Sequence, residues 1–168
     1  MMRKKLKIVR WLSKKIGEYD IGNDFWQASD AQVDRPFLAF SRTVYLPNQD
    51  MVVMGGLDDF IPNKPTFSAA CLLIAEVPLN SYDNLYVQHT LKSMTHKRGC
   101  FSALFHEGMV FVFGGLNYTE KVLRRCERYS LQDNRWEPLA DMCEPRKNSS
   151  VCSLTTDTLY VFGGSSQS

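Results

Sequence analysis

Histidine and cysteine are the residue types of this chain best suited to metal binding or nucleophilic catalysis, but their spacing favours neither. The three histidines, His89, His96 and His106, form no H-x-H or H-x-x-x-H pair. The five cysteines are odd in number and lack a Cys-x-x-Cys pair, which favours reduced thiols over disulfides or a zinc site. They are Cys71, Cys100, Cys126, Cys143 and Cys152. We therefore expect no metal, no cofactor and no catalytic residue.

Composition and charge are those of a globular protein. The chain has 168 residues, of which 44% are hydrophobic and 12% aromatic, and its formal net charge is +2. This balance does not favour a nucleic-acid or anionic-membrane surface. No stretch approaches the roughly 20 apolar residues of a membrane span, and charges interrupt the first fifteen residues, unlike a secretory signal. We expect the protein to lie in the cytoplasm, where it could associate with the cytoskeleton.

A pair of glycines recurs at the end of a short apolar stretch. The stretches read MVVMGG, VFVFGG and LYVFGG, and their glycines are Gly55 and Gly56, Gly114 and Gly115, and Gly163 and Gly164. β-Branched and aromatic residues over four positions predict a buried strand, and two glycines at its end allow a close backbone approach. Self-similarity of this kind indicates a repeat protein.

Two further groups of residues recur in register with the glycine pairs. Arg35, Arg98 and Arg146 each precede a glycine pair, with room between for a strand, a turn and a second strand. Tyr129 stands seven residues before Trp136, and Tyr19 stands seven before Trp26, with turn formers between them. Leu79 and Tyr86 have the same separation in the middle copy. Each copy is therefore expected to contain four strands.

Double glycine, Glu-Arg-Tyr, Asn-x-Trp, Leu-Ala-x-Met and Pro-Arg, in this order, resemble the kelch repeat. The best match runs from Arg98 to Arg146, and the other copies are weaker. The resemblance implies an all-β fold of kelch-type β-propeller blades, each of four antiparallel strands. By this interpretation the glycine pairs, the repeat arginines and the Tyr and Trp residues are structural, and burying each ring contributes about 2 to 3 kcal/mol.

The repeat divides the chain into two nearly complete blades with partial blades at both ends. The basic N-terminal segment is predicted as an edge strand or loop. The alternative is a membrane-surface or mitochondrial-targeting helix, of which Leu6, Val9, Leu12 and Ile16 would share one face. A closed propeller needs about 4 to 8 blades, so we expect the repeat to continue beyond Ser168. Completion by association and a small closed ring are the alternatives. The expected ranges are 1–13 for the basic segment, and 14–168 for the repeat region, comprising 14–30, 35–94 with a long loop at 57–69, 98–142 and 146–168.

The candidate partner-binding residues lie on loops. In kelch adaptors that grip peptides, contacts come from the loop after the double glycine and from the segment around the repeat arginine, and the long loop adds apolar groups between prolines. Simple solvated loops, or packing of the long loop over its blade, are equally compatible with the sequence. The candidates are Asp58, Asp59, Phe60, Ile61, Lys97, Asn117, Tyr118, Lys147 and Asn148.

The resemblance implies a non-catalytic protein-interaction module or scaffold that binds a protein partner. One alternative is the substrate-recruiting part of a ubiquitin-ligase adaptor, although the dimerisation and cullin-binding domains of such adaptors are absent from these residues. Another is a fragment of a kelch-fold enzyme acting on sugars or small polar substrates, since some kelch-fold proteins are copper radical oxidases. No cysteine here is paired with the ligands that such chemistry needs.

Overall fold

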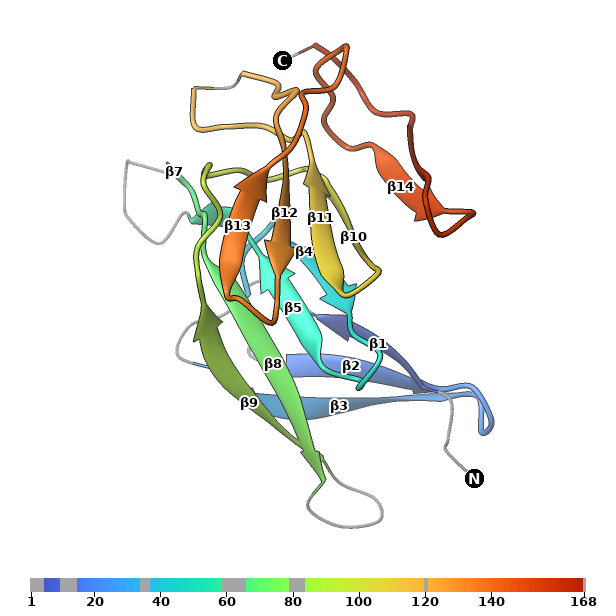
Figure 1. Cartoon of the computed structure of the whole chain (residues 1–168). Helices are drawn as coiled ribbons and strands as arrows, with labels where there is room; N and C mark the ends of the chain where they lie inside the picture. The colour runs from blue at the N-terminus through green and yellow to red at the C-terminus, as the bar shows by residue number, and fades with distance from the viewer. Residues whose placement is uncertain are drawn as a thin grey trace.

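The structure is a computed structural model that describes residues 5–9, 15–33, 37–58, 66–78, 84–119 and 121–167. Within these residues every regular element is a β-strand, and the strands form blades that follow one another along the chain (Figure 1). The all-β fold of four-stranded antiparallel kelch blades expected from the sequence is confirmed. The part of the chain that the structure describes contains no helix long and apolar enough to cross a membrane.

The third blade is complete and matches the best-preserved repeat. Its strands are β10 (Ser102–His106), β11 (Met109–Phe113), β12 (Cys126–Ser130) and β13 (Arg135–Pro138), paired in that order and all antiparallel. Glu107 and Gly108 turn the chain between β10 and β11, and both have positive φ, as a two-residue hairpin turn with the right twist requires. The central strand β11 alternates buried and half-buried residues, the period of two that a packed strand needs.

The middle blade repeats this order with a longer excursion. It consists of β4 (Arg42–Tyr45), β5 (Met51–Met54), β8 (Cys71–Pro78) and β9 (Asn84–Leu91), again antiparallel. Between β5 and β8 the chain forms a separate ladder of β6 (Leu57–Asp58) and β7 (Thr66–Phe67). The ends of the long loop predicted at 57–69 are therefore strands, and residues 59–65 lie outside the described part.

The N-terminal unit contains the two strands of a partial blade and, within the basic segment, the edge strand that the sequence predicted. It consists of β1 (Lys5–Val9), β2 (Lys15–Asp20) and β3 (Phe25–Gln32). β1 pairs with β2 as an edge strand, so the helical alternative is wrong for Lys5–Val9. The end of β3 pairs in parallel with β9, which joins the N-terminal unit and the middle blade into one seven-stranded sheet. The sequence did not predict this parallel junction.

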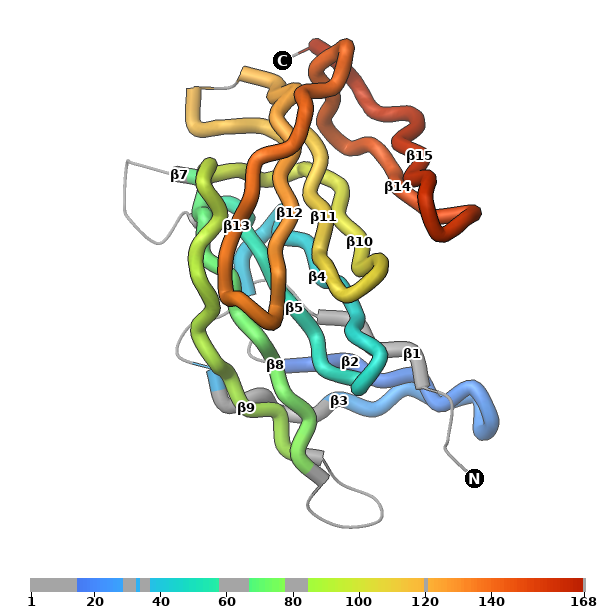
Figure 2. The backbone as a smooth tube through the Cα atoms, viewed as in Figure 1, coloured from blue at the N-terminus to red at the C-terminus, as the bar shows by residue number. Residues whose placement is uncertain are grey.

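The C-terminal unit is a hairpin of β14 (Ser150–Ser153) and β15 (Leu159–Phe162). It corresponds to the first two strands of a blade, and in the described residues it pairs with no N-terminal strand. Figure 2 shows β14 and β15 beside β10 of the third blade and away from β2. Within the described strands, the two ends of the chain therefore do not close a small ring.

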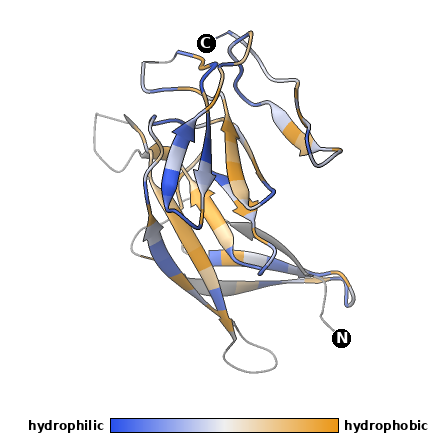
Figure 3. Cartoon of the chain, viewed as in Figure 1, coloured by the Kyte–Doolittle hydropathy of each residue, from blue (hydrophilic) through white to orange (hydrophobic). Residues whose placement is uncertain are grey.

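The blades pack face to face through two apolar clusters. The first joins the middle and third blades through buried side chains that include Val52, Met54, Phe101, Val112 and Trp136. The second joins the middle blade to the N-terminal unit and includes Ile16, Val53 and Ile74. Figure 3 shows hydrophobic residues on β5 and β8 of the middle blade and on β11 of the third blade. The first strands β4, β10 and β14 are neighbours in sequence order, as expected of blades arranged around an axis.

A buried polar contact accompanies the second cluster. The Tyr86 hydroxyl donates a hydrogen bond to Glu18, and Gln27 Nε2 donates to the same carboxylate at 2.7 Å. Both Tyr86 and Glu18 are almost fully buried, and burial together with the Glu18 contact raises the pKa of Tyr86. The N-terminal unit is thus attached to the middle blade by a satisfied polar pair as well as by apolar packing.

Candidate functional site

The end of each blade that carries the double glycine, here called the double-glycine end, is built by close backbone approaches. Gly114 has a φ of 62°, and a Cβ at this residue would lie 2.2 Å from the carbonyl oxygen of Arg146. Its neighbour Gly115 donates a backbone hydrogen bond to the same carbonyl at 2.8 Å. Gly56 makes the equivalent bond to the carbonyl of Arg98 at 3.0 Å. The glycines therefore let the segment that enters the next blade cross the end of the previous one.

The same backbone contacts bring several predicted candidates to the double-glycine end. Gly99 and Leu116 exchange two hydrogen bonds, which sets the segment containing Lys97 beside the loop that begins at Asn117. Lys147 exchanges the same two bonds with Ser165, and the Asn148 N–H donates to the carbonyl of Cys100 at 2.7 Å. The candidate segments 97–99, 116–119 and 147–148 therefore lie on one end of the molecule, although they come from two blades.

The loop at Asn117 is held by its own side chain. Asn117 Oδ1 accepts hydrogen bonds from the Thr119 N–H, the Thr119 hydroxyl and the Lys121 N–H, at 2.8 to 3.1 Å. Tyr118 stands at the tip of this loop with 67% of its surface exposed. Asn117 therefore fixes the loop, and Tyr118 is the side chain that the loop presents to solvent. Lys97 and Asn148 are exposed on neighbouring segments.

The candidates in the long loop cannot be placed in this surface. Asp59, Phe60 and Ile61 lie outside the described residues. Asp58 is described only through its backbone, which pairs with Thr66 in the β6–β7 ladder.

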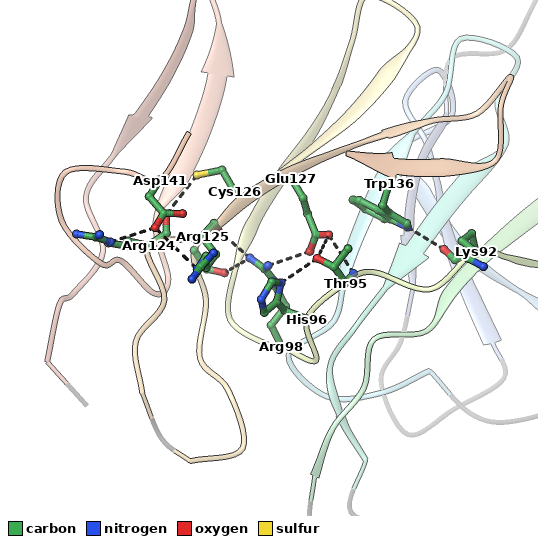
Figure 4. Close-up of polar contacts among 11 residues, drawn as sticks. Lys92, Thr95, His96, Arg98, Arg124, Arg125, Cys126, Glu127, Trp136 and Asp141 are labelled. Carbon is green, nitrogen blue, oxygen red and sulfur yellow. Dashed lines mark hydrogen bonds and ion pairs between the residues drawn. The ribbon is translucent and has the colours of Figure 1, made fainter. Parts of the chain in front are cut away.

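A buried ion pair lies at the boundary between the middle and third blades (Figure 4). Arg98 Nη2 donates to Glu127 Oε1 at 2.8 Å, and both side chains have an exposed fraction of at most 1%. Arg98 Nη1 also donates to the carbonyls of Gly114 and Arg125. The other oxygen of Glu127 accepts from the N–H and hydroxyl of Thr95, at 3.0 and 2.6 Å. Burial lowers the pKa of Arg98, while the Glu127 carboxylate opposes that shift.

This pair connects two blades through one residue. The side chain of Arg98 binds its own blade, whereas its backbone N–H and C=O bond to Ser68 and Gly56 of the middle blade. Arg146 partly repeats the arrangement, because its Nη1 donates to the carbonyl of Gly163 at 2.9 Å. Arg146 is half-buried and pairs with Glu144, two residues away. The repeat arginine is therefore a structural connector, and of the two that the structure describes, Arg98 has the buried carboxylate partner.

The register of the middle blade differs from that predicted. Arg35 lies outside the described residues. The residue after each of Arg98 and Arg146 pairs with the residue after a double glycine, and in the middle blade Ala39 makes this pair with Leu57. Leu38 therefore has the position of Arg98. By the strand pairing next to the glycines, Leu72 stands where the third blade has Glu127. The middle blade therefore has a leucine at both positions of the ion pair. The prediction of a repeat arginine at Arg35 is therefore wrong in register, because this blade has Leu38 at the position of Arg98.

The aromatic register of the middle blade also differs. Tyr129 and Trp136 are direct cross-strand partners with ring centroids 5.0 Å apart. The corresponding pair in the middle blade is Ile74 and Gln88, whereas Tyr86 lies opposite Glu76, and Leu79 lies outside the described residues. The assignment of Leu79 and Tyr86 to the aromatic positions was therefore wrong. The β8–β9 hairpin is longer than the β12–β13 hairpin, so a constant separation along the sequence does not keep the register.

Trp136 packs between blades, and Trp26 does not. Trp136 is 8% exposed and its Nε1 donates to the carbonyl of Lys92 at 2.8 Å (Figure 4). Trp26 is 55% exposed, although its ring pairs with Tyr19 at a centroid distance of 5.1 Å. The two hairpins thus have the same internal structure and different surroundings.

We expect Trp136→Phe to lower the free energy of unfolding by about 0.5–1.5 kcal/mol, because the part-buried hydrogen bond to the Lys92 carbonyl is lost. Trp26→Phe should leave stability nearly unchanged, since the exposed indole makes no such bond among the described residues. Urea unfolding followed by circular dichroism measures both variants. Equal losses for the two substitutions would contradict the different packing of the two hairpins.

The remaining candidates for chemistry do not converge. Cys71, Cys100 and Cys126 are buried, and burial raises the pKa of each thiol. Cys143 is exposed beside an open hollow of about 420 Å³ whose lining includes Arg146 and Val161. Within the described ranges, no three His, Cys, Asp or Glu side chains are placed to hold a metal ion.

Comparison with known proteins agrees with the geometry. The Kelch motif family model matches residues 97–142. Over 74 residues the chain is 34% identical to Kelch-like protein 41a of Danio rerio, covering 44% of this chain and 12% of that protein. Over 148 residues it is 29% identical to Kelch-like protein 40 of Mus musculus, covering 87% of this chain and 21% of that protein.

A solved structure shows the same fold. The structure of YjhT superposes with a TM-score of 0.70 at 11% identity, over 91% of this chain and 46% of that chain. The chain therefore spans about half of this structure and between 12% and 21% of the two Kelch-like proteins compared. The repeat motif, the strand pairing within each blade and these similarities lead to one conclusion: residues 97–142 carry a kelch motif, and the chain has the fold of kelch-type β-propeller blades.

Proposed function

We propose that this chain is a non-catalytic protein-interaction module whose double-glycine end binds a protein partner. The observation that carries the proposal is the convergence of segments 97–99, 116–119 and 147–148 on that end. They are held there by backbone hydrogen bonds between the segments that connect the strands, and rigid scaffolds place recognition loops in this way. Tyr118 is the best anchor of this surface, because tyrosine is enriched at interfaces and this side chain is largely exposed.

The proposal includes a cytoplasmic setting. All five cysteines are free thiols in the structure, and Cys143 is exposed, which fits a reducing compartment better than an oxidising one. Cytoskeletal proteins and ubiquitin-ligase subunits are the partner classes to score first, because the sequence resemblance points to scaffolds and adaptors of these kinds.

The test compares the proteins captured by the intact chain with those captured by Tyr118→Ala. The substitution removes an exposed ring and leaves the Asn117 bonds that shape the loop, so stability should not change. Gln132→Ala, in the exposed turn between β12 and β13 at the other end of the same blade, is the matched control. We expect Tyr118→Ala alone to reduce capture of a specific partner by about tenfold, the loss of roughly 1.4 kcal/mol of binding energy. Identical capture by all three proteins would contradict the proposal.

A further inference from the structure

The double-glycine end of the third blade is more basic than the chain as a whole. The segments 95–99, 116–125 and 139–148, which connect the strands at this end, contain seven Lys or Arg residues against three Asp or Glu residues. Their formal net charge is therefore +4, whereas that of the whole chain is +2. The balanced charge of the chain thus conceals a basic surface.

The exposed carboxylates described in these segments are already paired with arginine. Asp141 Oδ2 lies 3.1 Å from Arg124 Nε and 3.8 Å from Arg125 Nε, so two guanidinium groups share one carboxylate. Glu144 pairs with Arg146 at 3.5 Å. These acids therefore do not neutralise the lysines of the same end.

Three lysines around Tyr118 form no ion pair with a carboxylate in the part of the chain that the structure describes. They are Lys97, Lys121 and Lys147. The Asn117 N–H donates to the carbonyl of Lys121 at 3.1 Å, which places Lys121 at the base of the Tyr118 loop. Burial raises the pKa of the Cys100 thiol, and the positive charges of Arg42 and Lys147 oppose that rise. Lys147 therefore lies over the segment that enters the third blade, on the same end as Lys97.

This surface is separate from the packing between blades. Neighbouring blades pack against the faces of a blade, as the two apolar clusters do, whereas the connections at its ends face solvent. Lys97 and Lys121 are exposed and Lys147 is half-buried. Exposed charges at the rim of an interface select a partner of opposite charge and speed its association, so this end favours an acidic partner surface.

We propose that the double-glycine end binds an acidic segment of its partner protein, with an apolar partner side chain on Tyr118 and carboxylates at Lys97, Lys121 and Lys147. A peptide fits better than nucleic acid because Asp141 and Glu144 lie in the same segments. These acids would repel a continuous phosphate backbone, whereas a peptide can place its carboxylates only where lysines lie. The inference rests on the proposed function and adds the class of partner.

The test uses the full chain and two capped, fluorescently labelled peptides: Glu-Glu-Glu-Leu-Glu-Glu-Glu and the same peptide with glutamine in place of every glutamate. Fluorescence anisotropy at low ionic strength should show that the glutamine peptide binds about tenfold more weakly. A chain carrying Lys97→Gln, Lys121→Gln and Lys147→Gln should lose about the same factor for the glutamate peptide, as expected when several exposed charge pairs are removed. Added salt should weaken binding of the glutamate peptide to the unchanged chain.

Lys92→Gln is the matched control, because it removes an exposed lysine beside the turn at the opposite end of the blades. It should bind the glutamate peptide like the unchanged protein. The proposal is overturned if the glutamate peptide does not bind, if the glutamine peptide binds equally, or if Lys92→Gln weakens binding as much as the triple substitution. Unchanged thermal unfolding of each variant shows that charge and not the fold has been altered.

The other possible occupants give different results, each of which contradicts an acidic peptide. Tighter binding of a uridine oligonucleotide than of the glutamate peptide, lost in the triple variant, would assign the surface to nucleic acid. Self-association lost in the triple variant, without peptide binding, would assign it to a second copy, whose hairpin turns expose Glu107 and Asp157. Partner capture that depends on Tyr118 but not on the lysines would leave the proposed function standing and refute its acidic partner.

Discussion

Replacing Glu127 with leucine should lower the free energy of unfolding by about 3–5 kcal/mol, because it leaves the Arg98 guanidinium charged and buried without its partner. Both side chains have an exposed fraction of at most 1%, so solvent cannot substitute for the carboxylate. The loss should also release Thr95, whose N–H and hydroxyl both bond to Glu127. Urea unfolding followed by circular dichroism provides the measurement.

The middle blade supplies the matched rescue. It has Leu38 and Leu72 at the positions of Arg98 and Glu127. The double substitution Arg98→Leu with Glu127→Leu should therefore be more stable than Glu127→Leu alone, although the carbonyls of Gly114 and Arg125 lose a donor. A double variant that is less stable than the single one would show that the arginine has a role beyond pairing with Glu127.

Of the substitutions of a repeat glycine by alanine, Gly114→Ala should lower the free energy of unfolding most. The new Cβ would lie 2.2 Å from the backbone oxygen of Arg146 and 3.0 Å from the side chain of Met142. Backbone oxygen cannot rotate away, so the blades must separate or the strand must shift. The substitution should also weaken the neighbouring bond from the Gly115 N–H to Arg146.

Gly163→Ala is the matched control, because Gly163 has a similar φ of 68° but nothing within 4 Å of its added Cβ. It carries only the left-handed backbone strain, about 1–2 kcal/mol. Gly114→Ala should lower the free energy of unfolding by about 1–3 kcal/mol more than this, because the added methyl group is overpacked. Thermal unfolding of the two variants side by side checks the difference, and equal destabilisation would mean that the crossing of Arg146 over Gly114 is not tight.

Much of the fold could be predicted because its constraints are local. A strand that ends in two glycines, with a tyrosine and a tryptophan across a short turn, needs no distant information to identify a blade, and Tyr129 and Trp136 are indeed cross-strand partners. The same pattern located the hairpin of Tyr19 and Trp26. Periodicity and turn chemistry therefore predicted the hairpins of the third blade and the C-terminal hairpin, and the kelch resemblance implied the four-stranded antiparallel blade.

The register of the middle blade was not predicted, because one residue type replaces another there and because one hairpin is longer. The repeat predicts an arginine before each hairpin, which points to Arg35, whereas the middle blade has Leu38 at the position of Arg98. Tyr86 was assigned to an aromatic position that belongs to Gln88, since the β8–β9 hairpin is longer. An apolar pair can replace a buried ion pair without changing the backbone, so the residue type alone does not give the register.

The candidate site was predicted residue by residue but not as a surface. Lys97, Asn117, Lys147 and Asn148 were chosen from their positions beside glycines and arginines, and only the backbone bonds between blades bring them to one end. The exposure of Trp26 could not be predicted, because it depends on what packs against the hairpin and not on the hairpin itself. The internal bonds of the two hairpins are the same, and the environment decides which one is buried.

Cross-linking of the chain to the partner whose capture depends on Tyr118 tests the central claim most directly. Lys97, Lys121 and Lys147 lie at the double-glycine end, whereas Lys92 lies beside the β12–β13 turn at the opposite end of the blades. With a lysine-reactive cross-linker and mass spectrometry, we predict that the partner is joined to at least two of Lys97, Lys121 and Lys147 and not to Lys92. Cross-links to Lys92, with none to the other three lysines, would contradict binding at the double-glycine end.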